Sequence, residues 1–64
     1  MTLQQISNLV GKSESSIKTN LNRTNESLKN KYGIYIVKTG RGKNVDYYLE
    51  GLYENSLAIF LKSH

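Results

Sequence analysis

Apolar residues at the start of the chain recur at the three- and four-residue spacing of an amphipathic helix. They are Leu3, Ile6, Leu9 and Val10. Thr2, followed three residues later by Gln5, has the pattern of a capping box, which satisfies free backbone N–H groups at the beginning of a helix. The pattern predicts a short helix over residues 2–10.

A tight turn and a second helix are predicted directly afterwards. Gly11 can adopt the left-handed conformation that ends a helix, and Ser13 is a favoured residue for starting the next one. One apolar stripe with helical period then follows, with a threonine within it. It consists of Ile17, Leu21, Thr24 and Leu28. We therefore expect a single helix over residues 14–31.

The pattern changes from helical to extended after Gly33. The segment IYIVK is rich in β-branched and aromatic residues, TGRGKN is typical of a turn, and VDYYLE alternates between apolar and polar residues. This pattern predicts a β-hairpin over residues 34–49, with its loop at residues 40–44. The apolar residues that follow predict a C-terminal helix over residues 52–62. Residues 1–64 therefore form one α+β domain.

Composition excludes several classes of protein. The 64 residues include no Cys, which excludes disulfides and thiolate ligands, and their 38% hydrophobic and 22% charged content is typical of a globular domain. No apolar run approaches the length of about 18 residues that a membrane span needs, so we expect a cytoplasmic protein with no membrane partner. The only histidine is the terminal His64, and the five carboxylates are scattered. We expect no catalytic activity, no cofactor and no metal site.

Charge is distributed unevenly along the chain. The net charge is +4, but residues 12–43 hold eight Lys or Arg against two Glu, a net charge of +6. Residues 44–64 carry a net charge of −2. A basic centre beside a mildly acidic end indicates that one surface faces a polyanion and that the other faces solvent or protein.

The order of helix, tight turn, helix and hairpin is that of a winged helix-turn-helix domain. The segment TLQQISNLVGKSESSIKTNL resembles the helix-turn-helix of many bacterial regulators. The segment TNESLKNKYGIYIVKTGRGKNVDYYLEG is similar to the N-terminal winged-helix module of Mga-like and antiterminator-type activators and of biotin-repressor-like regulators. The resemblance covers residues 2–51. It implies that the helix over residues 14–31 enters the major groove of DNA and that the hairpin is a wing along the backbone.

One side of the predicted helix 14–31 carries side chains that can contact DNA. They are Ser15, Lys18, Thr19, Asn22 and Arg23. Lys and Arg bind phosphates or guanine edges, Asn pairs with adenine, and Ser and Thr contact either. In the hairpin loop, Arg41 and Lys43 are candidates for phosphate contacts or minor-groove insertion. The competing interpretations are an ordinary polar helix surface and a simple glycine-rich turn, and Glu26 on the same side of the helix repels phosphate.

These features predict sequence-specific binding to double-stranded DNA by a small bacterial, phage or plasmid transcriptional regulator. The alternative is a winged-helix module that binds protein, as a replication accessory or as a phage inhibitor of a host factor. Five tyrosines and an apolar C-terminal segment keep this alternative open.

The predicted C-terminal helix has an apolar arc of about 200° on a helical wheel, wider than one core contact needs. With Leu52 and Ile59 assigned to the core, Leu57 and Leu61 are left for a homodimer interface. The alternative is that the whole arc is buried within the monomer.

Overall fold

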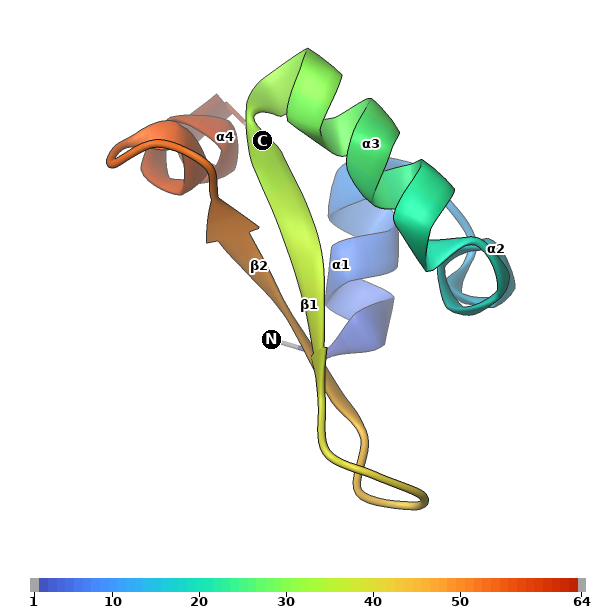
Figure 1. Ribbon diagram of the computed structural model, residues 1–64. Helices are drawn as coiled ribbons and strands as arrows, with labels where there is room; N and C mark the ends of the chain where they lie inside the picture. The colour runs from blue at the N-terminus through green and yellow to red at the C-terminus, as the bar shows by residue number, and fades with distance from the viewer. Residues whose placement is uncertain (1, 64) are drawn as a thin grey trace.

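Four helices and a two-stranded hairpin make up the computed structural model, which describes residues 2–63 (Figure 1). In chain order they are α1 (Leu3–Val10), α2 (Glu14–Thr19), α3 (Leu21–Tyr32), β1 (Ile34–Thr39), β2 (Asp46–Gly51) and α4 (Ser56–Ser63). The predicted α+β class is confirmed. Met1 and His64 lie outside the described residues.

Helix α1 and the turn after it form as the sequence predicts. The Thr2 backbone N–H donates to Gln5 Oε1 at 2.8 Å and Thr2 Oγ1 accepts from the Gln5 N–H at 3.2 Å, which completes the capping box. Gly11 has φ +70° and donates its N–H to the Ser7 carbonyl at 3.0 Å. Ser13 Oγ accepts from the Ser16 N–H at 3.2 Å and thereby caps α2. Two local motifs thus fix the first change of chain direction.

The prediction of one continuous helix over residues 14–31 is wrong. Asn20 has φ −127° and ψ 51°, so it is not helical and separates α2 from α3. Its N–H still donates to the Ser16 carbonyl at 3.0 Å and its carbonyl accepts from the Thr24 N–H at 2.9 Å, so it ends one helix and starts the next. Asparagine is a poor residue for a helix interior. The break lets Ile17 and Thr24 each turn toward one core.

The hairpin is longer than predicted at its C-terminal end. β1 and β2 pair antiparallel from Ile34↔Gly51 to Thr39↔Asp46, so β2 ends at residue 51 rather than at residue 49. The connecting loop spans residues 40–45. Gly40 has φ +87°, and an added Cβ would lie 1.9 Å from the Asn44 carbonyl oxygen, so this close approach requires glycine.

Helix α4 begins at Ser56, four residues later than predicted. Leu52 is not helical, because its N–H continues the ladder of the hairpin by donating to the Gly33 carbonyl at 2.8 Å. The helical wheel that assigned Leu52 and Ile59 to the core is therefore wrong, and their side chains are 43% and 63% exposed. Phe60 is buried instead, and Leu57 packs against the core.

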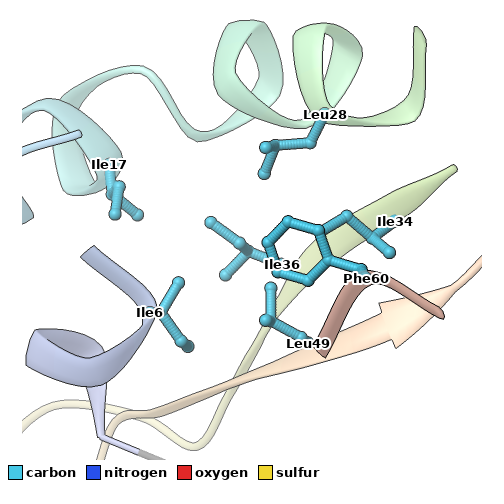
Figure 2. Close-up of a cluster of buried hydrophobic side chains, with 7 residues drawn as sticks. All are labelled: Ile6, Ile17, Leu28, Ile34, Ile36, Leu49 and Phe60. Atoms are coloured by element: carbon cyan, nitrogen blue, oxygen red, sulfur yellow. The ribbon is translucent and has the colours of Figure 1, made fainter. Parts of the chain in front are cut away.

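Every helix and both strands contribute to one hydrophobic core (Figure 2). Its buried members are Ile6, Ile17, Leu28, Ile34, Ile36, Leu49 and Phe60. Ile36 of β1 lies near the centre of this set in Figure 2, and Ile34 lies at its right-hand side. The core thus holds the hairpin against α1, α2 and α3 on one side and α4 on another.

A polar side chain joins α3 to the hairpin. Asn25 Nδ2 donates to the Ile36 carbonyl at 2.9 Å, and the Ile36 N–H donates to Asn25 Oδ1 at 2.7 Å. Both backbone groups of Ile36 are therefore occupied by one amide side chain. This pairing covers the middle of the outer edge of β1 and fixes the position of α3 along the strand.

We predict that Asn25→Ala lowers the free energy of unfolding by about 1–3 kcal/mol, because it leaves two partly buried backbone groups without partners. Asn30→Ala is the matched control, since Asn30 is exposed on the same helix and makes no side-chain hydrogen bond among residues 2–63. Its effect stays within about 0.5 kcal/mol. Urea denaturation measures both variants. Equal stability of the two variants would contradict the role given to Asn25.

Candidate nucleic-acid interface

The predicted base-contacting residues come from two helices rather than one. Ser15, Lys18 and Thr19 lie on α2, while Asn22 and Arg23 lie in the first turn of α3, and all are exposed. One surface hollow follows the break between the helices. It is lined by Lys18, Thr19, Asn20, Leu21, Asn22 and Arg23. The structure therefore brings four of the predicted residues together at the α2–α3 junction and leaves Ser15 outside this hollow.

A second hollow lies between α2 and the hairpin. Its charged lining residues are Glu14, Lys18, Lys38, Lys43 and Asp46. The loop lies at the end of the hairpin opposite α4 and bends toward the side of α2 (Figure 1). Lys18 on α2 and Lys43 on the loop therefore face the same depression, and Arg41 is exposed nearby on the same loop. The predicted helix and wing cations thus share one side of the molecule.

Two further cations border this side and escaped the sequence analysis. Lys12, in the turn after α1, lines a groove with Asn20 and Arg23. Lys38, near the end of β1, lines the hollow between α2 and the hairpin. Lys12 was not predicted as a contact residue, because its segment was interpreted only as a turn. Lys38 could have been found from its place at the end of the strand next to the basic loop, although it lies on the same side of β1 as the buried Ile34 and Ile36.

The basic side chains described by the structure are not paired with carboxylates. Among residues 2–63, no Lys or Arg forms an ion pair within 4.0 Å of a carboxylate. Lys29 does make a cation–π contact, because its Nζ lies 5.4 Å from the centroid of the Tyr35 ring. Unpaired surface cations are strongly hydrated, and they can exchange that hydration for phosphate oxygens.

Glu26 limits how far the basic surface extends along α3. It lines a hollow with Arg23 and Lys31, one helical turn beyond Asn22. A carboxylate there repels phosphate. Glu26 therefore interrupts the basic surface on α3, as Glu14 and Asp46 do in the hollow between α2 and the hairpin.

Comparisons of the chain with protein-family models, with curated proteins and with solved structures found no match. Within residues 2–63, no helix combines the length and apolarity required to cross a bilayer. The same residues hold no group of three His, Cys, Asp or Glu side chains suited to a metal ion. The function is therefore inferred from the geometry and charge of the surface described above.

Proposed function

We propose that this protein binds double-stranded DNA in a sequence-specific manner as a winged helix-turn-helix domain. The observation that carries the proposal is that Lys18 and Lys43, from α2 and from the hairpin loop, line one hollow. Asn22 and Arg23 lie beside it at the α2–α3 junction. A helix terminus and a flexible basic loop on one side of a small domain suit one groove and its flanking phosphates.

The chemistry of each side chain suggests its contact. Asn22 and Arg23 lie at the N-terminal end of α3, the part of a recognition helix that reaches base edges. Arginine forms paired hydrogen bonds with guanine O6 and N7, and asparagine does so with adenine. Lys18 and Thr19 on α2 are assigned to phosphates, together with Arg41 and Lys43 in the wing. Ser15 is a peripheral phosphate contact.

This function fits a small cytoplasmic transcriptional regulator from a bacterium, phage or plasmid. The second candidate is a winged-helix module that binds protein. It is favoured by apolar side chains exposed on α4 and in the segment before it, namely Leu52, Tyr53, Ile59 and Leu61. The net charge of +6 over residues 12–43 favours DNA, because nonspecific attraction to phosphates grows with the number of cations.

A homodimer through α4 is part of the proposal, with a corrected set of interface residues. Leu57 is half-buried against the core, so it offers an α4 partner less area than Leu61 or Ile59. Leu61 is 39% exposed and Ile59 63% exposed, and they lie on opposite flanks of α4, about 160° apart around the helix axis, with the buried Phe60 between them. Pairing of the flank that carries Ile59 around a two-fold axis would present two recognition surfaces to a pseudo-palindromic site, and Leu61 would lie outside the contact.

The α3 contacts predict a loss of base discrimination. Replacing Asn22 or Arg23 by Ala should cost about 1–3 kcal/mol at particular base pairs and relax the preference there, with folding unchanged because both side chains are exposed. Selection from a random duplex library, followed by anisotropy titrations, measures the preference. An unchanged preference in the Asn22→Ala, Arg23→Ala double variant would refute the assignment.

The wing should supply charge rather than base recognition. Replacing Arg41 and Lys43 by Ala should weaken binding about equally on all sequences and reduce the salt slope by roughly one to two units. Lys62→Ala is the control, because Lys62 lies on α4, away from the loop. A salt slope that is the same in the double variant and in the wild type would place the wing away from DNA.

The α4 dimer is tested without DNA. Ile59→Glu places a charge on the exposed face and leaves the core intact, so it should convert a dimer to a folded monomer in sedimentation equilibrium. A wild-type chain that remains monomeric at high protein concentration removes the dimer from the account.

A further inference from the structure

The hydrogen bonds of Asn25 reveal the orientation of the backbone groups along the hairpin. In an antiparallel pair, residues opposite each other either exchange both backbone hydrogen bonds or exchange none. The N–H and the carbonyl of Ile36 both bond to Asn25, so Ile36 and Leu49 exchange no backbone hydrogen bonds with each other. The N–H and carbonyl of Leu49 therefore point away from β1, toward the outer edge of β2.

A second observation confirms this alternation. Leu52 donates its N–H to the Gly33 carbonyl at 2.8 Å, which makes Gly33 and Leu52 a hydrogen-bonded pair, three positions from the Ile36↔Leu49 pair. Tyr47 and Gly51, two positions on either side of Leu49, consequently also direct their backbone groups to the outer edge.

This outer edge of β2 is open. Among residues 2–63, the outward backbone groups of Tyr47, Leu49 and Gly51 have no hydrogen-bond partner. Surface hollows lie at both ends of the edge, one including Tyr47 and the other including Leu49 and Gly51. The edge of β1 differs, because Asn25 covers its middle. An open row of donors and acceptors is a template for another strand.

The carboxylates along this edge favour an added strand that carries positive charge. Asp46 and Glu50 alternate with the edge positions on the exposed face of β2, and Glu54 follows in the next segment. Residues 44–61 contain no Lys or Arg. A strand from a second copy would bring these carboxylates near their own counterparts, which is destabilising. Glu50 and Glu54 repel DNA for the same reason, whereas Asp46 shares a hollow with Lys18, Lys38 and Lys43.

We propose that the outer edge of β2 binds an extended, lysine- or arginine-bearing segment of a partner protein, which adds to the hairpin as a third strand. Backbone hydrogen bonds to Tyr47, Leu49 and Gly51 align the segment. Its basic side chains lie beside Glu50 and Glu54, and the hollow that these residues line with Leu52, Tyr53 and Leu57 accepts an apolar side chain. Leu49 and Gly51 line a different hollow from the one that Lys18 and Lys43 line, so the proposal does not depend on DNA binding, although Tyr47 borders both sites.

The test titrates the isotope-labelled full chain with a short peptide of alternating lysine and valine, followed by amide resonances. We expect saturable shifts and slower hydrogen exchange at Tyr47, Leu49 and Gly51. The same peptide N-methylated at its valines should show no saturable binding, because the edge that faces Tyr47, Leu49 and Gly51 then lacks its N–H donors. Glu50→Lys should weaken binding about two- to fivefold. Glu26→Lys, the same charge change on α3, should leave it unchanged.

Three results would overturn the proposal. They are the absence of saturable shifts on β2, equal binding of the N-methylated peptide, and equal binding of a glutamate–valine peptide. Dilution-dependent shifts of the edge amides in Ile59→Glu without peptide would mean that a second copy occupies the edge, which also overturns it. DNA binding is monitored at Lys18, Arg23 and the hairpin loop, so its failure is distinguishable from failure at this edge.

Discussion

The two hydrogen bonds between Asn25 and Ile36 are the interaction on which the arrangement of this small domain depends. A two-stranded hairpin is marginal by itself and needs a helix to pack on it. The core supplies the attraction, but apolar contacts alone permit sliding of α3 along β1. The side-chain amide of Asn25 fixes one position of α3 along β1, because it bonds to both the N–H and the carbonyl of Ile36. The position of the hairpin loop relative to the α2–α3 junction follows from that register.

The same register sets where the basic and the acidic parts of the surface lie, and the two meet where Asp46 shares a hollow with Lys18 and Lys43. Helix α2, the first turn of α3 and the loop present Lys18, Arg23, Arg41 and Lys43, while β2 and the segment after it are acidic. The break at Asn20 contributes to this division, because it turns the polar sides of α2 and α3 outward around one junction. The proposed DNA contacts and the proposed binding of a basic strand thus use different parts of the chain.

Much of the local structure is predictable from the sequence because it depends on neighbouring residues. The Thr2 capping box, the turn at Gly11 and the strands around the glycine-rich loop are of this kind. The break at Asn20 was missed because the apolar stripe keeps its helical spacing across it, and because asparagine also occurs inside α3 and therefore does not mark a break by itself. The late start of α4 was missed because Leu52 bonds to Gly33, a contact between distant segments. Asn25 was missed for the same reason, since nothing near it in the chain indicates its partner.

The candidate site was predictable in its residue types but not in its geometry. Lys18, Asn22 and Arg23 are exposed, as predicted. The helical wheel that placed them on one side assumed a single straight helix, whereas they lie on α2 and α3. Leu57 was assigned to a partner although it packs against the core, because the wheel began at a residue outside the helix. The most direct test of the account is the affinity for a random duplex measured over a range of salt concentrations. The account predicts binding at low salt with a log–log slope of about −3 to −5, whereas no binding or a flat salt dependence would contradict it.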